Sequence, residues 1–129
     1  MTQPDQARVA ALTPLLLPEI VSLPEELDIA NGLAVGDELI GALRPGVRVL
    51  IADMSSTKYC DSTAMRQLII ASNHAVCVGA ELRVVVASPV VRHLMHVTGA
   101  DQMLRMYPDM AAALTGALEG GQRDATGGR

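Results

Sequence analysis

The sequence predicts an α/β fold: a small, mostly parallel mixed sheet with helices packed against it. Two apolar runs at residues 47–52 and 81–87 have the length and composition of buried strands, and a helix start signal follows each of them. Because a helix between two strands carries the chain back across the sheet, those strands pair in parallel. The length of 129 residues suits one domain. We expect this domain to span residues 1–118, followed by a flexible glycine-rich tail at 119–129.

The N-terminal third contains only weak strand signals. Residues 1–10 are polar and are expected to fray, and two short apolar pieces follow at 12–17 and 19–23. Prolines punctuate both pieces, so they suit edge strands, arranged as a short hairpin or as two strand fragments. The first helix is predicted to begin at Asp28 and to end before Pro45. Its predicted buried stripe consists of Ile29, Leu33, Gly36, Ile40 and Leu43.

The stretch at 47–78 is the centre of the predicted fold. Its apolar strand is nearly unbroken, as in strands that are covered on both faces. A polar loop follows, and Asp61 or Ser62 then caps a helix by accepting from its free amide groups. One face of this helix carries Met65, Leu68, Ile69, Ser72 and Val76. The outer face is only half polar because it holds Ile70 as well as Arg66, so either a neighbouring element covers it or a partner binds there.

The second half repeats the alternation of strand and helix. The strand at 81–87 leads to Ser88-Pro89, where a hydroxyl N-cap and a proline at the first helical position predict a helix that ends at Gly99. A short strand is predicted at 103–107. A C-terminal helix follows Pro108-Asp109.

Composition and charge exclude several classes of partner. The chain has no Phe or Trp and only two Tyr, so it lacks the aromatic platforms on which single-stranded nucleic acids stack. Its formal charge of −4 also opposes binding to a phosphate backbone. No window approaches the ~18 apolar residues of a membrane span, and no leader pattern opens the chain. We therefore expect a cytoplasmic protein with no membrane partner, in which Cys60 and Cys77 are reduced.

Enzymatic sites are not indicated. Ser62 is presented at a helix N-terminus, but it lacks the flanking glycines of the G-x-S-x-G turn of serine hydrolases. His93 and His96 have a spacing that can share a metal, yet no third ligand is evident, so no metal is predicted. The phosphate-cradling patterns G-x-G-x-x-G and G-x-x-x-x-G-K-[ST] are both absent, and no cofactor is predicted.

Carboxylates give a more suggestive pattern. Asp28 precedes a helix, Asp53 ends the central strand and Asp61 precedes Ser62. Each alone suits a helix cap or a solvated loop charge, but all three can lie near the Ser62 hydroxyl if the strand ends meet at one edge. A phosphoryl group on Ser62 would add about −1.5 to −2 charges at pH 7, which the helix N-terminus offsets only in part.

The central stretch resembles a known family. VLIADMSSTKYCDSTAMRQL is similar to the centre of STAS domains, where an apolar strand ending in Asp is followed by a loop and Asp-Ser-Ser/Thr-Gly-Leu. Here Ala64 and Met65 stand in place of Gly-Leu. The similarity continues through GAELRVVVASPVVRHLMHVTGADQMLRMYPDMAAAL, and residues 26–28 match an early Glu-Leu-Asp. The resemblance covers about residues 23–118 and implies a STAS-like sandwich.

The resemblance implies regulation rather than catalysis. In anti-sigma factor antagonists of the STAS type, the position of Ser62 is phosphorylated by an anti-sigma factor that is also a serine/threonine kinase. Asp28 and Asp61 match acidic positions beside that site. The unmodified antagonist binds the kinase and releases the sigma factor, and phosphorylation breaks the association. The implied function is a non-enzymatic anti-sigma factor antagonist that regulates sigma-factor-dependent transcription.

Two alternatives stay open. Thr63 adjoins Ser62 and is a second candidate phosphate acceptor. The chain could also be a non-phosphorylated STAS scaffold or a module that binds a small ligand. For the antagonist, the protein is expected to be a monomer or a weak dimer. Its predicted kinase-binding surface consists of Asp28, Asp61, Thr63, Arg66 and Ile70.

Overall fold

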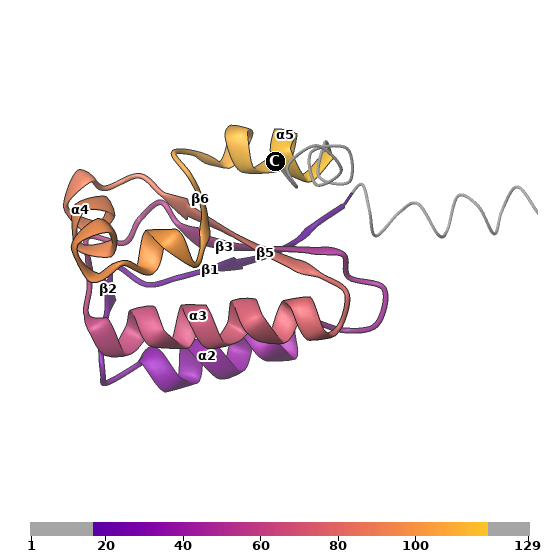
Figure 1. Ribbon diagram of the computed structural model, residues 1–129, viewed down its shortest axis with the longest axis horizontal. Helices are drawn as coiled ribbons and strands as arrows, with labels where there is room; N and C mark the ends of the chain where they lie inside the picture. Colours follow the sequence, from indigo (N-terminus) through magenta and orange to yellow (C-terminus); the bar gives the residue numbers. More distant parts are fainter. Residues whose placement is uncertain (1–16, 119–129) are drawn as a thin grey trace, which may run out of the picture.

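The computed structural model describes residues 17–118, and its centre is a four-stranded sheet between helices (Figure 1). Its elements are β1 (Glu19–Ser22), β2 (Glu26–Leu27), α2 (Gly32–Gly41), β3 (Val49–Met54), β4 (Tyr59–Cys60), α3 (Ser62–Cys77), β5 (Glu81–Val86), α4 (Pro89–Thr98), the 3₁₀ helix η1 (Ala100–Gln102), β6 (Arg105–Tyr107) and α5 (Met110–Leu118). The strand order is β1-β3-β5-β6, and each of these pairs is parallel. The predicted α/β fold is confirmed, and the described residues contain no antiparallel pair.

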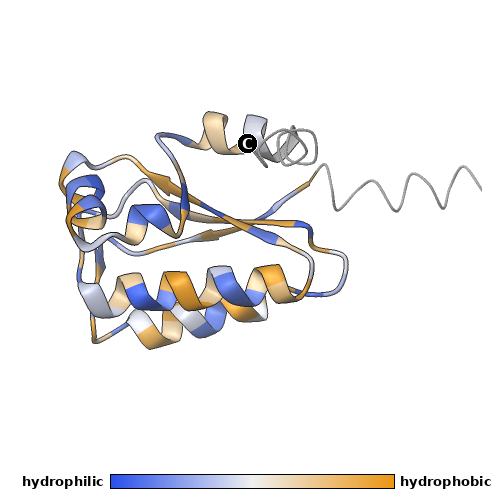
Figure 2. Ribbon diagram, viewed as in Figure 1, coloured by the Kyte–Doolittle hydropathy of each residue, from blue (hydrophilic) through white to orange (hydrophobic). Residues whose placement is uncertain are grey.

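Helices cover both faces of this sheet, which explains why its strands are nearly unbroken apolar runs. α2 and α3 lie against one face and α5 lies against the other (Figure 1). Along β3, Leu50, Ala52 and Met54 belong to the larger core, between the sheet and α2 and α3. Val49 and Ile51 point the other way, into the smaller core under α5. Residues two apart share a face, so one apolar run supplies both cores. Figure 2 shows largely apolar colouring along the central strands.

Arg83 is an exception in the sheet, because this charged side chain is fully buried under α5. Its Nε donates to Oε2 of Glu81 at 2.7 Å, and its Nη1 donates to the carbonyl oxygen of Ala113 at 3.1 Å. The guanidinium carbon lies 5.5 Å from the ring centroid of Tyr107, which is a cation–π distance. A Cβ atom on Gly116 would lie 2.5 Å from Nη1, so only glycine allows this approach. Arg83 therefore holds α5 on the sheet.

The N-terminal third contains an edge strand, as predicted. β1 lies at the edge of the sheet and pairs with β3. The other piece of the predicted hairpin, before residue 17, lies outside the described residues. So do the start at 1–10 and the tail at 119–129, where fraying and flexibility were predicted. Within the described part, no helix has both the length and the apolar character needed to cross a bilayer.

The predicted helix boundaries after β5 are confirmed by their caps. Oγ of Ser88 accepts from the amide of Val91 at 3.3 Å, and Pro89 is the first residue of α4. Gly99 ends α4 with a φ of 82°, a left-handed conformation that glycine adopts without steric cost. Before α5, Oδ1 of Asp109 accepts from the amide of Ala112 at 2.8 Å.

The predicted face of α3 is only partly right. Met65 and Leu68 are buried as predicted, but Val76 is exposed. The buried stripe of α3 continues instead through small residues, which are Ala64, Ala71 and Ala75. Alanines carry little hydrophobic signal in a sequence pattern, yet they allow the helix to lie close to its neighbours.

The first helix differs most from the prediction. α2 begins at Gly32, not at Asp28. Its buried residues are Gly32, Val35, Gly36 and Leu39. Ile29 and Leu33, which were predicted to be buried, are 75% and 64% exposed. The prediction holds at Gly36, which is buried, and at Ile40 and Leu43, which pack partly buried against the core. It is wrong at Ile29 and Leu33, because the contact at Gly32 is one that a search for large apolar side chains passes over.

Two of the three glycines of α2, Gly32 and Gly36, lie against α3. A Cβ atom on Gly32 would lie 3.4 Å from Cα of Ala64. One on Gly36 would lie 3.3 Å from Cβ of Gln67 and 2.5 Å from its Oε1. The absence of side chains at these two positions therefore lets α2 and α3 approach closely, and Gly36 is the tighter of the two.

Gly36→Val is expected to lower the free energy of unfolding by about 1–3 kcal/mol, because the added methyl groups push α2 away from α3. Gly41→Val is the matched control in the same helix, since a Cβ there meets nothing within 4 Å. It should change stability by about 0.5 kcal/mol or less. Urea denaturation measures both. Equal losses would show that the contact between α2 and α3 is not tight.

Candidate functional site

A second, two-stranded sheet brings together two acidic motifs, which are Glu26-Leu27-Asp28 and the Asp61-Ser62 step before α3. β2 pairs in parallel with β4, so that Leu27 is opposite Cys60. The amide of Asp61 donates to the carbonyl oxygen of Leu27 at 3.0 Å, just past the pair. The Glu-Leu-Asp segment therefore lies beside the segment that leads into α3. This pairing explains why residues more than thirty positions apart in the sequence meet at one edge of the molecule.

Asp61 is the N-cap of α3 and also joins α3 to the turn before α2. Its Oδ1 accepts from the amide of Ala64 at 2.9 Å, within the first turn of the helix. Its Oδ2 accepts from the amide of Ile29 at 3.0 Å. Both oxygens thus bind backbone donors, and the negative charge lies at the positive end of the helix dipole.

Asp28 shapes the turn that leads into α2. Its Oδ1 accepts from the amide of Ala30 at 2.9 Å, and its carbonyl oxygen accepts from the amide of Gly32 at 2.7 Å. Asp28 and Asp61 therefore lie on adjacent segments, as predicted. Asp53 accepts from the amide of Ser55 at 3.0 Å, and no hydrogen bond in the described part of the chain links it to either of the other two.

Ser62 is the first residue of α3 and is exposed, as is Thr63 after it. Their two backbone amides have no acceptor among the described residues, because the Asp61 cap takes the amide of Ala64 and the helix ladder begins at Met65. The site therefore combines an accessible hydroxyl, two open amide donors and the positive end of a helix. An anion attached to Ser62 would be stabilised there.

The side of α3 that faces solvent extends this site. Arg66 and Ile70 are exposed, and Ile70, at 42%, is not covered by any described element. The sequence prediction missed the exposed apolar residues next to Asp28 and Asp61. These are Ile29, Leu33 and Tyr59. A correct start for α2 would have placed Ile29 outside the helix.

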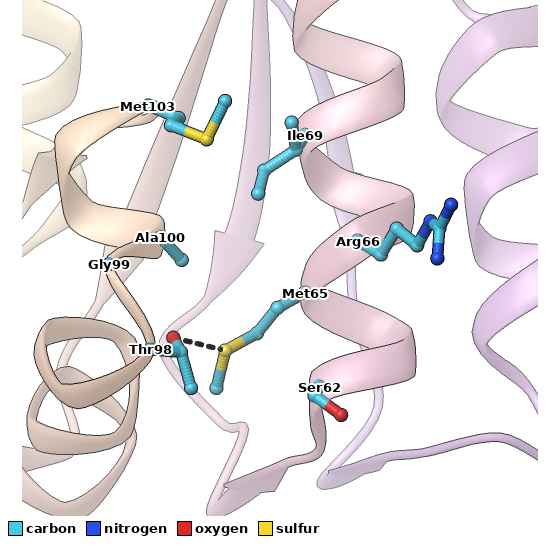
Figure 3. Close-up of a pocket in the computed structure, with 8 residues that line it drawn as sticks. All are labelled: Ser62, Met65, Arg66, Ile69, Thr98, Gly99, Ala100 and Met103. Carbon is cyan, nitrogen blue, oxygen red and sulfur yellow. Dashed lines mark hydrogen bonds between the residues drawn. The ribbon is translucent and has the colours of Figure 1, made fainter.

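A pocket of about 190 Å³ lies between α3 and the segment that joins α4 to η1 (Figure 3). Its lining residues are Ser62, Met65, Arg66, Ile69, Thr98, Gly99, Ala100 and Met103. In Figure 3, Met65 and Ile69 point toward η1, Ser62 lies at the N-terminal end of α3, and the side chain of Arg66 points away from η1. Oγ1 of Thr98 contacts Sδ of Met65 at 3.2 Å across the pocket. The pocket is mostly apolar and could hold a small apolar group.

The two histidines with metal-ligand spacing lie on the surface of α4. His93 and His96 are both exposed on α4. Nδ1 of His96 lies 2.9 Å from Oδ2 of Asp101. Within residues 17–118, no group of three His, Cys, Asp or Glu side chains is placed to hold a metal ion.

The two cysteines are expected to react very differently. Cys60 is buried and Cys77 is exposed. Burial, with a smaller contribution from the Asp61 carboxylate, raises the pKa of Cys60 to about 12. The Cys60 thiol is therefore neutral and shielded, so Ellman's reagent should titrate one thiol rapidly in the native protein and the second only after denaturation. Cys77→Ser should remove the rapid reaction. A rapid reaction that persists in this variant would contradict the burial of Cys60.

The same shift makes stability depend on alkaline pH. The unfolded chain releases the Cys60 proton at a lower pH than the folded chain, so the unfolded state binds fewer protons in this range. Cys60 therefore stabilises the fold below about pH 9, and this contribution is lost as the pH rises toward 12.

A family model, the STAS domain, matches residues 16–113, and the chain therefore belongs to the STAS domain family. The match spans the whole arrangement from β1 to the middle of α5 and includes both acidic motifs. The fold described above is thus that of a STAS domain.

Individual relatives are distant. The anti-sigma-F factor antagonist RsfB of Mycobacterium tuberculosis is 23% identical over 105 residues, which cover 81% of this chain and 84% of RsfB. The crystal structure of an anti-sigma factor antagonist from Mycobacterium paratuberculosis has a TM-score of 0.68 at 23% identity, with 76% of this chain and 83% of that chain covered. The phosphorylated form of the Bacillus cell fate determinant SpoIIAA has a TM-score of 0.54 at 16% identity, with coverage of 73% and 86%.

Proposed function

We propose that this chain is a cytoplasmic anti-sigma factor antagonist that binds an anti-sigma factor serine/threonine kinase and is switched off by phosphorylation at Ser62. The observation that carries the proposal is the exposed Ser62 hydroxyl at the open N-terminus of α3, between two adjacent acidic motifs. Membership of the STAS family, which includes antagonists such as RsfB, supports the same role. The protein itself is then a substrate and a binding partner, not an enzyme.

In the proposed reaction, the kinase transfers the γ-phosphoryl group of ATP to Oγ of Ser62. ADP leaves, and the hydroxyl proton passes to a base of the kinase. Ser62 can reach a kinase active site because no described element covers it. The kinase active site then repels the phosphorylated Ser62. The carboxylate base of the kinase, which faced the hydroxyl before the reaction, now faces a phosphate that carries about −1.5 to −2 charges. Phosphorylation thus weakens the complex in which it occurs.

The proposed kinase-binding surface surrounds Ser62. It contains the predicted residues Asp28, Asp61, Thr63, Arg66 and Ile70, and we add the exposed apolar residues Ile29, Leu33 and Tyr59. A partner interface commonly has such an apolar centre with a polar rim. In this surface the apolar side chains supply contact area, and the hydroxyl supplies the position that the kinase modifies.

The test is to incubate the purified protein with a candidate anti-sigma kinase and ATP, and to map any added phosphate by mass spectrometry. We expect one phosphate at Ser62. It should be absent in Ser62→Ala and retained in Thr63→Ala, the matched control one residue away. Phosphate on Thr63 alone, or tight binding with no phosphate at all, would contradict the proposed switch.

The pocket beside Ser62 favours a second candidate function. Its mostly apolar lining suits a STAS module that holds a small apolar ligand and uses Ser62 at the pocket mouth for binding only. In that case the protein would bind its partner or ligand without ever being phosphorylated. The mass-spectrometric test therefore separates the two functions.

A further inference from the structure

Arg66 lies four residues, about one helical turn, after Ser62 in α3, and its side chain extends away from η1 (Figure 3). Its side chain is exposed and has no hydrogen bond or ion pair with another described residue, whereas Arg44, Arg83 and Arg92 each have a recorded partner. The nearest carboxylate along the chain, that of Asp61, is already bound to two backbone amides. Within the described part of the chain, Arg66 is therefore a cation without a partner beside the candidate modification site.

The spacing of Ser62 and Arg66 suits an ion pair. Residues four apart on a helix have Cβ atoms about 5–6 Å apart, and the acidic partner is best placed on the N-terminal side. A phosphate on Ser62 would hold that position. Phosphate also binds guanidinium groups through paired, charge-assisted hydrogen bonds, and the open amides of Ser62 and Thr63 offer further donors.

We propose that Arg66 binds the phosphoryl group on Ser62 within the same chain. This inference rests on the proposed function and adds a second component to the switch. The unmodified protein presents a free guanidinium to its partner, and the phosphorylated protein withdraws it. Phosphorylation then changes the surface twice, because it adds an anion and removes an accessible cation.

The pairing of Arg66 with the phosphate also offsets electrostatic repulsion within the phosphorylated protein. Asp61 precedes Ser62, and Asp28 lies on the adjacent segment, so a phosphate there is close to two carboxylates. The negative phosphate and these two negative carboxylates repel one another. Arg66 is the basic residue of the first two turns of α3 and supplies the compensating charge.

The test uses protein in which phosphoserine is inserted at position 62 during translation, so that no kinase is needed. A ³¹P NMR titration measures the second ionisation of the phosphate, which has a pKa near 6 in an isolated group. An adjacent guanidinium stabilises the dianion, so Arg66→Gln should raise the titration midpoint by about half a pH unit relative to the wild-type background. Arg66→Lys should restore part of the difference.

Arg48→Gln is the matched control. Arg48 is also exposed, but it lies directly before β3, at the opposite end of that strand from the loop that leads to Ser62. Its loss gives the same change in net charge, and the titration midpoint should stay within about 0.1 pH unit of the wild-type background. Equal midpoints for Arg66→Gln and Arg48→Gln would overturn the proposed pairing.

This test is independent of the kinase assay. If no kinase modifies Ser62, the proposed function fails, while the titration still measures the pairing of Arg66 with the inserted phosphate. If the kinase does modify Ser62 but the midpoints are equal, the proposed function stands and the role of Arg66 is rejected.

Discussion

Ser62→Asp is expected to bind the anti-sigma kinase about tenfold more weakly than the wild-type protein. The carboxylate adds one negative charge at the N-terminus of α3, where the proposed kinase supplies its own carboxylate base. A repulsion of about 1.4 kcal/mol corresponds to a tenfold change, and two like charges near a protein surface reach this value readily. Isothermal titration calorimetry with the kinase and without ATP measures the affinity.

Ser62→Asn provides the control for this prediction. Asparagine has nearly the same shape as aspartate but no charge, so it should bind within about threefold of the wild-type protein. If Asp and Asn weaken binding equally, size rather than charge governs the interface. If both bind like wild type, the electrostatic switch is wrong.

Asp61→Ala is expected to lower the free energy of unfolding by about 2–3 kcal/mol. The substitution removes the N-cap of α3 and also the acceptor for the amide of Ile29. Loss of an N-cap costs about 1 kcal/mol, and a hydrogen bond to a charged group contributes about 1.5 kcal/mol or more. Urea denaturation, with a check that the m-value is unchanged, measures the difference.

Asp61→Ser distinguishes the contributions of the two hydrogen bonds that the Asp61 side chain accepts. A serine hydroxyl can cap the amide of Ala64, but it is too short to serve Ile29 as well. We expect Asp61→Ser to recover about half of the stability lost in Asp61→Ala. If the two variants are equally unstable, the cap contributes nothing and the bond between α3 and the α2 turn accounts for the whole effect.

The parts of the fold that could be predicted from sequence are those with strong local signals. The apolar runs of β3 and β5 are long, and both faces of the sheet are covered, so the strands were found with errors of one or two residues at their ends. The start of α3 at Ser62 and the start of α4 at Pro89 follow from their capping residues. These boundaries are set by hydrogen bonds between residues close in the sequence, so the capping residues alone predict them.

The parts that could not be predicted depend on contacts between distant segments. β2 and β4 have two residues each, too few for a periodic pattern, and their pairing emerges only in three dimensions. The predicted stripe of α2 included Gly36 but wrongly added Ile29 and Leu33. The close contact of Gly32 and Gly36 with α3 depends on the absence of side chains, which a pattern of large apolar residues does not record.

The candidate site combines features that the local sequence predicts with features that depend on contacts between distant segments. Ser62 and Asp61 were assigned from a helix cap and a motif, and the structure places both at the start of α3. The position of Asp28 beside them depended on whether the strand ends meet, which the pairing of β2 with β4 answers. The proposed role of Arg66 depends on a guanidinium that has no partner in residues 17–118, and no sequence pattern reveals this.

The central claim is that a phosphate on Ser62 ends the association with the kinase. The direct measurement is the affinity of the kinase for the same protein preparation before and after complete phosphorylation, followed by phosphatase treatment. We expect phosphorylation to weaken binding about 100-fold, since the phosphate carries up to twice the charge of aspartate, and we expect phosphatase to restore the original affinity. Affinities that agree within twofold for the two forms would contradict the account.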